Sequence, residues 1–368
     1  MKITEIRIQR LALPLDPAFH AAWDPVPRTS FGATVVYVHT DEGLVGVGSG
    51  DIMGGFVDFE HLFIGTDPLR IVEQVRRLET VAFHGSRYWP LEVAFWDIIG
   101  QVTGQPVSVL FGNSTDRLKV YASCGELKAP AARAESAVAL RAQGIRALKI
   151  RIDRDRIDEG LAAVRATREA VGDTMDIMVD MNQAWRMSGD TAPATDVPRA
   201  RRTAAALREL DVLWMEEPLP YGDLRGYQLL RQEGQRVAGG EMMRSFPELL
   251  DAMDRDAFDV YQPDVVLAVG MLRARTIAEL AHARNRWFTP HSWTNGIGVL
   301  ANLHVAAGVG AAPYFEYPYD PPGWTPERRD FMLGEPLRVD SDGDIVVPPR
   351  PGLGIELDHD ALARFEIK

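Results

Sequence analysis

The stretch Ala147-Leu148-Lys149-Ile150-Arg151-Ile152 has the alternation of a β-strand, with two cations among aliphatic residues. Successive side chains of a strand point to opposite faces, so Lys149 and Arg151 share one face, and Leu148, Ile150 and Ile152 share the other. The aliphatic face fits against a layer of helices, and the cations then point into the mouth of a barrel. Asp180 and Asn182 share a face of the next apolar run in the same way. A charged side chain that faces the interior of a barrel is costly unless it is paired or bound to metal, so we expect these residues to be functional.

A polar group also ends each of the apolar runs that follow along the chain. The series is Lys149 with Arg151, then Asp180, Glu216, Glu241, Asp264, His291 and Glu316. Its successive members are 23 to 36 residues apart, and one strand, one helix and two loops need roughly 30 residues. The spacing therefore predicts one polar group per β/α unit, at the carboxyl end of each strand, where β/α barrels carry their active sites.

Eight candidate strands alternate with helices over this part of the chain. The strands are residues 118–121, 147–152, 177–182, 213–216, 236–241, 259–262, 287–291 and 313–316, and the helices include 133–143 and 199–210. This alternation predicts an α/β fold with a TIM-type barrel. The alternative is an open doubly wound sheet, but no glycine-rich phosphate turn follows the early strands.

The chain before the barrel indicates a small α+β domain. Residues 33–40 and 44–48 predict a hairpin that turns at Asp41-Glu42-Gly43. Two helical stripes follow, one from Ile71 to Leu78 and one from Leu91 to Ile99. We expect three parts: a domain at 1–115, the barrel at 116–318, and a Pro- and Gly-rich segment at 319–368 that packs back on the first domain.

Composition narrows the function classes. The chain has 368 residues and a formal net charge of −12, which argues against a nucleic-acid surface but not against a small anionic substrate. Cys124 is the only cysteine, so no disulfide forms within the chain. No apolar run approaches the ~18 residues of a membrane span, and residues 1–6 alternate like a strand rather than a signal peptide. We expect a cytoplasmic enzyme for a small molecule, with no membrane partner.

Three carboxylates of the series, Asp180, Glu216 and Glu241, come from consecutive β/α units. Carboxylate oxygens without Cys or His favour Mg²⁺ or Mn²⁺ over Zn²⁺. A carboxylate taken singly is more often a surface or capping residue. Because all three stand at strand ends with the spacing of β/α units, a metal site is the better interpretation.

The motifs together resemble the enolase superfamily, and within it the mandelate racemase-like subgroup of the mandelate racemase/muconate lactonizing enzyme family. Residues 180–185, Glu216-Glu217-Pro218 and Gly240-Glu241 resemble the three metal-ligand motifs of that family. Pro263-Asp264 and Pro290-His291-Ser292 resemble its His–Asp dyad. Residues 94–100 resemble the helix of its capping domain, with Gln101 where Lys is usual.

The resemblance implies a capping domain, a (β/α)7β barrel and a C-terminal tail that returns to the cap. It also implies removal of the proton α to a carboxylate, with the resulting enediolate stabilised on Mg²⁺. His291 is then the base and Asp264 orients it. Glu316 hydrogen-bonds a substrate carboxylate oxygen, and Asn182 lies beside the substrate. Family members commonly assemble through dimers, so a homo-oligomer is expected.

The chain departs from the subgroup at Arg151. The usual pattern there is Lys-x-Lys, whose second Lys acts as a base on the face of the substrate opposite to His. A guanidinium stays protonated in proteins, so two-base racemisation is disfavoured. We expect instead that His291 removes the proton and then protonates a departing β-hydroxyl, with Arg151 electrostatic and Lys149 auxiliary or itself a base.

This one-base reaction is dehydration of an acid sugar, an aldonate or aldarate, to a 2-keto-3-deoxy acid by a hydro-lyase. An isomerase, either a racemase/epimerase or a lactone cycloisomerase, is the first alternative. The second alternative is a metal-binding protein without turnover. Loss of a metal ligand or of His291 would indicate it, and the chain retains all of these residues. His20, Trp23, Arg28 and Asp51 lie in flexible stretches that suit a lid, and we expect Trp23 and Arg28 to bind substrate.

Overall fold

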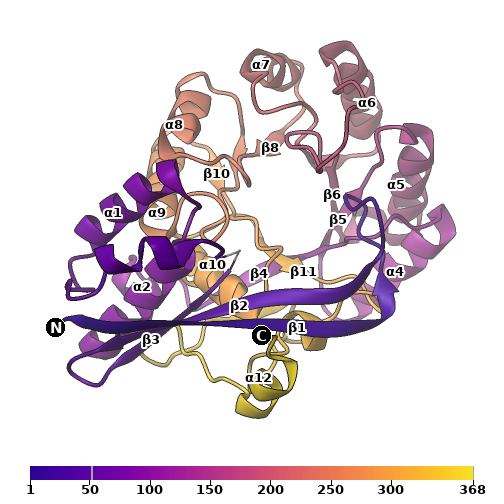
Figure 1. The fold of residues 1–368 in the computed structure, drawn as a ribbon. Coiled ribbons are helices and arrows are strands. Elements are labelled where there is room, and N and C mark those ends of the chain that lie inside the picture. The colour runs from indigo at the N-terminus through magenta and orange to yellow at the C-terminus, as the bar shows by residue number, and fades with distance from the viewer. Residues whose placement is uncertain (51–52, 368) are drawn as a thin grey trace.

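The structure is a computed structural model that describes residues 1–50 and 53–367. Asp51, one of the expected lid residues, lies outside the described residues. Two bodies of secondary structure are visible in Figure 1: a ring of strands surrounded by helices, and a long antiparallel ribbon that crosses beside the ring.

The ring is a β/α barrel. Seven helices follow seven of its eight strands, and all the strand pairings in the described ring are parallel. Beyond the end of the last helix, the Ala312 amide donates to the Phe288 carbonyl at 3.2 Å and brings the last strand beside the seventh. This confirms the predicted (β/α)7β barrel. The strands are β4 (Arg117–Ser123), β5 (Ala147–Arg151), β6 (Asp176–Asp180), β7 (Val212–Glu216), β8 (Val237–Gly239), β9 (Val260–Tyr261), β10 (Trp287–Phe288) and β11 (Phe315–Pro318). The helices are α4 (Pro130–Ala142), α5 (Ile157–Val171), α6 (Val197–Glu209), α7 (Leu224–Gln232), α8 (Phe246–Asp254), α9 (Met271–Ala283) and α10 (Gly296–Val309).

Five strands, β5, β6, β8, β9 and β10, end one to three residues earlier than the sequence pattern predicts. Strand β8 stops at Gly239, because Gly240 has a φ of +102° that an extended strand does not contain. Strands β9 and β10 stop before Pro263 and Pro290, which have no amide hydrogen for the ladder. Glu241, Asp264 and His291 therefore lie on loops just beyond the strands, at the carboxyl end of the barrel.

The cap consists of a three-stranded sheet and helices packed against it. The sheet has the order β1 (Ile3–Phe19), β2 (Arg28–Thr40) and β3 (Val45–Ser49), and the predicted hairpin is its β2–β3 turn. Helix α2 crosses β3 so closely that a Cβ at Gly48 would lie 2.0 Å from the Pro90 carbonyl, so glycine is required there. The helical segments are η1 (Phe56–Asp58), η2 (Glu60–Leu62), α1 (Ile71–His84), α2 (Trp89–Thr103) and α3 (Val107–Leu110).

Strand β1 continues through a proline-rich stretch where the sequence indicated flexible chain. It passes Pro14 and Pro17 and ends at Phe19. Proline is tolerated because β1 is the edge of its sheet, and its pairing with β2 shifts register between Pro14 and Phe19. The extension carries the β1–β2 connection over the barrel mouth.

The C-terminal segment returns to the cap, as predicted. Its backbone pairs with β1 through the Ile367 amide, which donates to the Arg10 carbonyl at 2.9 Å, and with α3 through Val107 and Gly352. The segment contains α11 (Pro326–Arg329), β12 (Asp344–Val346) and α12 (His359–Phe365), and β12 pairs antiparallel with β4. The division of the chain at residues 115 and 318 stays a prediction.

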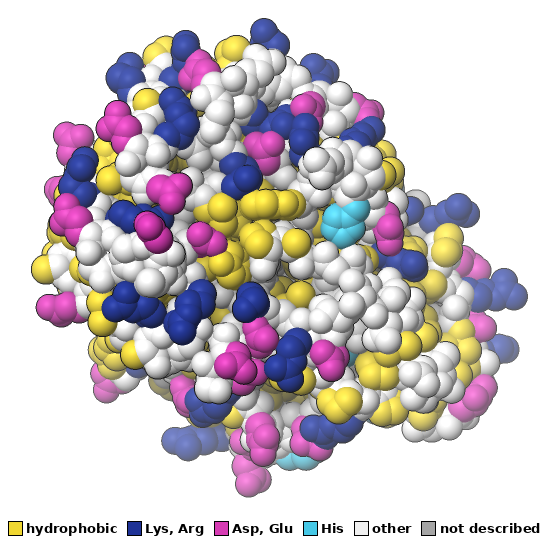
Figure 2. Space-filling view, turned by 180° about the vertical axis from the view of Figure 1, so that it is seen from behind, with side chains coloured by type: hydrophobic (Ala, Val, Ile, Leu, Met, Phe, Trp, Pro, Cys, Tyr) yellow, Lys and Arg dark blue, Asp and Glu magenta, His cyan; other side chains and the backbone are white. Residues whose placement is uncertain are grey.

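The surface carries charges of both signs. On the face in Figure 2, Lys and Arg side chains alternate with Asp and Glu, and neither sign covers a wide area. Among the described residues, no helix is both long enough and apolar enough to cross a membrane.

Candidate active site

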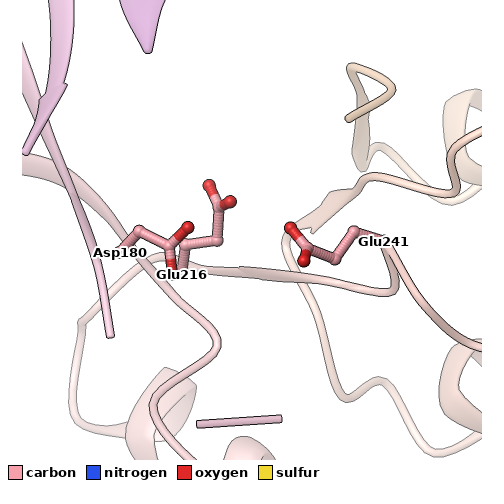
Figure 3. Close-up of side chains that lie close together, drawn as sticks. All are labelled: Asp180, Glu216 and Glu241. Atoms are coloured by element: carbon pink, nitrogen blue, oxygen red, sulfur yellow. The ribbon is translucent and has the colours of Figure 1, made fainter. Parts of the chain in front are cut away.

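Three carboxylates converge at the mouth of the barrel. Asp180 ends β6, Glu216 ends β7, and Glu241 lies two residues beyond β8. One oxygen of each lies within 4.8 Å of the others, and all three side chains are buried (Figure 3). Glu241 Oε2 is buried without a hydrogen-bond partner. A divalent cation fits this donor set, because it would satisfy that oxygen and offset the repulsion of three buried negative charges.

The two cations of β5 lie against these carboxylates. The Lys149 ammonium contacts Glu216 and lies 2.8 Å from Glu316 Oε1 and 3.5 Å from Asp180 Oδ2. The Arg151 guanidinium pairs with Asp180, and its Nε donates to the Cys124 carbonyl at 3.1 Å. The aliphatic residues of β5 are in the hydrophobic core, as the alternation predicts. Both cations therefore hold the carboxylates in place.

Neighbouring polar side chains fix the orientation of two carboxylates. Glu216 Oε2 accepts hydrogen bonds from Trp214 Nε1 at 3.1 Å and Gln262 Nε2 at 3.0 Å. Glu241 Oε1 accepts one from Trp185 Nε1 at 2.9 Å. The sequence interpretation missed Trp214 and Gln262, although Gln262 ends a predicted strand, where a polar residue signals the barrel mouth.

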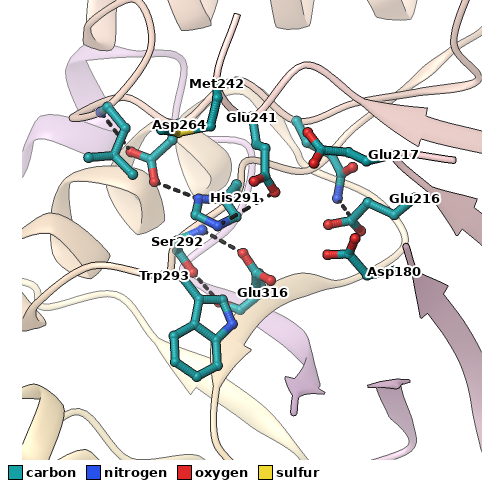
Figure 4. Close-up of polar contacts among 12 residues, drawn as sticks. Asp180, Glu216, Glu217, Glu241, Met242, Asp264, His291, Ser292, Trp293 and Glu316 are labelled. Atoms are coloured by element: carbon teal, nitrogen blue, oxygen red, sulfur yellow. Dashed lines mark hydrogen bonds and ion pairs between the residues drawn. The ribbon is translucent and has the colours of Figure 1, made fainter. Parts of the chain in front are cut away.

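His291 is held between two carboxylates (Figure 4). Its Nδ1 lies 2.9 Å from Asp264 Oδ2, and its Nε2 lies 3.6 Å from Glu241 Oε2. Asp264 is itself fixed, since its other oxygen accepts from the amides of Val266 and Leu267 at 2.8 and 3.2 Å. This arrangement points Nε2 at the carboxylate cluster.

Opposing effects set the charge of His291. Burial lowers its pKa, but the nearby carboxylates of Glu241, Glu316 and Asp264 outweigh burial and raise the pKa to about 10. Glu241 has the largest effect among these carboxylates, so a cation bound there would remove part of this stabilisation of the imidazolium.

Glu316 lies at the base of the site on β11. Its Oε2 accepts a hydrogen bond from the Ser292 amide at 2.6 Å. Burial opposes its ionisation, but Lys149 and His291 outweigh burial and lower its pKa to about 2. An ionised carboxylate only accepts hydrogen bonds. The predicted bond from Glu316 to a substrate carboxylate therefore requires a proton on one of the two groups.

A cavity of about 530 Å³ opens above these groups. The expected site residues Arg151, Asn182, Glu241 and His291 line it, and so do the lid residues Trp23 and Arg28. His20 does not line the cavity and is exposed. The sequence interpretation missed two further aromatic walls, Phe31 and Trp324.

The lid contacts the barrel through Trp23. The Arg151 guanidinium carbon lies 4.8 Å from the centre of the Trp23 ring, and Trp23 packs edge-on against Trp293 at 4.9 Å. Arg151 Nη1 also donates to Asn182 Oδ1 at 3.1 Å. A residue of the cap is thus in direct contact with the polar groups of β5 and β6.

Comparison with known proteins agrees with this architecture. A family model described as "Enolase C-terminal domain-like" matches residues 131–361. The 3,6-anhydro-alpha-L-galactonate cycloisomerase of Streptomyces coelicolor is 31% identical over 75% of this chain and 71% of that protein. The D-galactarolactone cycloisomerase of Agrobacterium fabrum is 29% identical over 100% of this chain and 99% of that protein. The D-galactonate dehydratase of Xanthomonas oryzae is 28% identical over 94% of this chain and 92% of that protein.

Solved structures share the whole fold. The crystal structure of a racemase from Streptomyces coelicolor with bound magnesium has a TM-score of 0.84 and 26% sequence identity, and the match covers 99% of this chain and 100% of that chain. Fold and site together define a capped β/α-barrel protein with three buried carboxylates that fit a divalent cation. The family model matches more than half of the chain, so the chain belongs to the enolase superfamily. A "putative mandelate racemase" from Bordetella bronchiseptica, with a TM-score of 0.86 and 27% identity over 100% of this chain and 98% of that chain, agrees with the mandelate racemase-like group.

Proposed function

We propose that this protein is a Mg²⁺-dependent hydro-lyase that dehydrates an acid sugar, an aldonate or aldarate, to a 2-keto-3-deoxy acid. The proposal rests on the geometry of His291. Among the described residues of the cavity, it is the only base candidate that faces the carboxylate cluster. His291 Nδ1 is bound to Asp264, its Nε2 faces Glu241, and the opposite side of the site presents Arg151 rather than a lysine.

Asp180, Glu216 and Glu241 are the residues that would hold the metal ion. Mg²⁺ fits three carboxylates, and the Streptomyces coelicolor racemase structure contains it. Mn²⁺ suits the same oxygens and stays a prediction. A bound ion would supply Lewis-acid polarisation of the substrate carboxylate and so acidify the neighbouring carbon.

His291 carries out both proton transfers in this proposal. A cation bound at Glu241 would offset the charge that raises the His291 pKa most, and Asp264 accepts the Nδ1 hydrogen, so Nε2 of the neutral imidazole takes the proton from the carbon next to the carboxylate. The same proton then goes to the hydroxyl on the following carbon, which departs as water. The resulting enol gains a proton at carbon 3, loses its hydroxyl proton at carbon 2 and becomes the 2-keto-3-deoxy acid.

Arg151 and Lys149 act by charge rather than by proton transfer. Arg151 lines the cavity beside Asp180, where its positive charge stabilises negative charge that develops on the substrate. Lys149 does not line the cavity and contacts three carboxylates, which suits a residue that positions them. A role for Lys149 as base stays a prediction.

A cycloisomerase is the second candidate. Its reaction begins with the same proton removal, but the leaving oxygen belongs to a ring, so the ring opens and no water is lost. The aromatic walls Trp23, Phe31, Trp293 and Trp324 suit the flat face of a ring substrate, and two relatives have cycloisomerase names.

A screen of acid sugars tests the proposal. Each sugar is incubated with protein and Mg²⁺, with and without EDTA, and 2-keto-3-deoxy acids are detected with semicarbazide. An EDTA-sensitive signal supports dehydration. The library is then examined by NMR in D₂O: deuterium uptake without loss of water indicates an epimerase, and ring opening indicates a cycloisomerase. Metal binding without any of these reactions indicates a protein without turnover.

A further inference from the structure

A second, smaller cavity adjoins the active-site cavity. It has a volume of about 250 Å³ and shares the walls Trp23, Asn182, Trp185 and Met187 with the larger one. The lid segment at Asp24 closes one side, and the loops after β5 and β6 close the others. We call it the side pocket. It lies beyond Asn182 from the reacting groups, where the far end of an extended substrate would reach.

The side pocket is lined by four carboxylates, and each of them is ion-paired with an arginine. Its lining includes Asp24, Asp153, Asp155 and Asp190, with Arg154 as the only basic residue among the lining residues that the structure describes. Arg154 is already bound, because its Nη2 donates to both oxygens of Asp190 at 2.9 and 3.0 Å.

The larger cavity offers no unpaired cation either. In its described lining the two Arg or Lys residues are Arg28 and Arg151. Arg28 makes two hydrogen bonds to Asp24, one of them 3.1 Å long between Nη2 and Oδ1, and Arg151 pairs with Asp180. Each cation near the far end of a substrate therefore has its own carboxylate partner.

This arrangement discriminates between two kinds of acid sugar. The hydroxyl groups of a sugar chain can donate to the side-pocket carboxylates, which accept several hydrogen bonds each. A second carboxylate at the far end would lose its hydration without gaining a free cation, since each arginine of the two linings is already paired with an aspartate. On the basis of the proposed function, we propose that the side pocket receives the uncharged, hydroxylated end of the substrate, so that the site selects aldonates over the aldarates of the same configuration.

The test compares matched pairs of acids. With Mg²⁺ present, kcat/KM is measured for D-gluconate against D-glucarate and for D-galactonate against galactarate, together with other pairs that the screen selects. We expect the monoacid of the reactive pair to be preferred by about tenfold or more, since a carboxylate that loses water without gaining a partner weakens binding by at least that factor. Equal or preferred turnover of the diacid overturns the inference while leaving dehydration in place.

The variant Asp24→Asn tests the cause of the preference, because it frees Arg28 to bind a second carboxylate. We expect the ratio of monoacid to diacid kcat/KM to fall about tenfold. The matched control is Asp251→Asn on α8. Asp251 also pairs with an arginine four residues later, Arg255, but both are exposed outside the cavities. An unchanged ratio in Asp24→Asn, or an equal fall in the control, contradicts the inference.

Calorimetric binding separates this inference from the proposed reaction. If no acid is turned over, the same pairs are titrated into the Mg²⁺-loaded protein. Tighter binding of the monoacid, lost in Asp24→Asn, supports the side-pocket assignment and refutes dehydration. Tighter binding of the diacid, or binding of neither acid, refutes the assignment.

Discussion

At the scale of single residues, His291 is the group on which the proposed chemistry depends. We expect His291→Asn to lower exchange of the substrate α-proton by about 10²–10⁴-fold, the usual contribution of a positioned general base. NMR in D₂O measures the exchange, and calorimetry with Mg²⁺ shows whether the metal site survives. We expect Mg²⁺ binding to be retained because the three carboxylates are unaltered. Exchange at the wild-type rate would eliminate His291 as the base.

Arg151 decides between one-base and two-base chemistry. Arg151→Lys places an amine where the racemising members of the subgroup have their second base, and an amine can lose its proton whereas a guanidinium does not. We expect the variant to gain deuterium exchange on substrates epimeric at carbon 2, by about tenfold or more over wild type. Arg255→Lys, an exposed change, is the control. No gain in exchange would show that Arg151 does not face the reacting carbon.

The sequence predicted some residues of the site and missed others for a physical reason. Asp180 and Glu216 end strands and His291 follows one, so their positions depend on local pattern and barrel topology. Trp324 and Phe31 line the same cavity but come from the C-terminal segment and the cap, and only tertiary packing brings them there. Gln262 lies between these two cases. It directly follows β9, but the sequence pattern did not distinguish it from an ordinary strand end.

At the scale of elements, helix α2 of the cap contacts the start of barrel helix α9 through Glu92. Glu92 Oε1 accepts from the Leu272 amide at 2.8 Å and from Trp96 Nε1 at 3.2 Å. Burial raises the pKa of Glu92 to about 7, against the opposing effect of these hydrogen bonds. The folded protein therefore binds the Glu92 proton more tightly than the unfolded chain does. The contribution of protonated Glu92 to the stability of the fold is complete below about pH 4.5 and is lost as the pH rises through 7.

We therefore expect Glu92→Gln to change the pH dependence of stability. As the pH rises from 4.5 to 8, the free energy of unfolding of the variant should increase by about 3 kcal/mol relative to that of wild type. Urea unfolding at a series of pH values measures the shift. Glu73→Gln on α1, at an exposed position, should show no shift. Parallel pH curves for Glu92→Gln and wild type would mean that Glu92 is not protonated in the fold.

Sequence periodicity predicted which elements exist but not where they end. The stripes at 71–78 and 91–99 predicted α1 and α2, because burial on one face enforces that pattern. The ends of β1 and β8 depended instead on a sheet edge and on one glycine, Gly240, whose backbone conformation the apolar pattern does not encode.

At the scale of the whole molecule, His304 joins the barrel, the cap and the C-terminal segment. This residue of α10 accepts from the Ser108 amide through Nδ1 and donates to the Leu353 carbonyl through Nε2, each at 3.1 Å. Burial lowers its pKa to about 4. The contribution of neutral His304 to the stability of the fold is therefore complete above about pH 6.5 and is lost as the pH falls through 4.

We expect acid to loosen the C-terminal segment first. Between pH 6.5 and 4, protonation of His304 should cost about 3 kcal/mol. Hydrogen exchange should show faster deuteration of residues 352–367 than of the barrel strands. His304→Gln should be less stable at pH 7 but should lack this part of the acid dependence. An acid profile identical to that of wild type would assign the effect to other groups.

The pairing of the C-terminal segment with β1 and β4 also affects how the chain is made. Strand β1 ends at Phe19 and β12 begins at Asp344, so 324 residues are added between them. At the usual 5–20 residues per second, a ribosome takes about 15–65 s to do so. For all of that time β1 lacks its contact with α12, and β4, once made, lacks its β12 partner. The C-terminal segment thus completes the packing of strands translated well before it, and we expect nascent chains stalled before β12 to bind chaperones or aggregate.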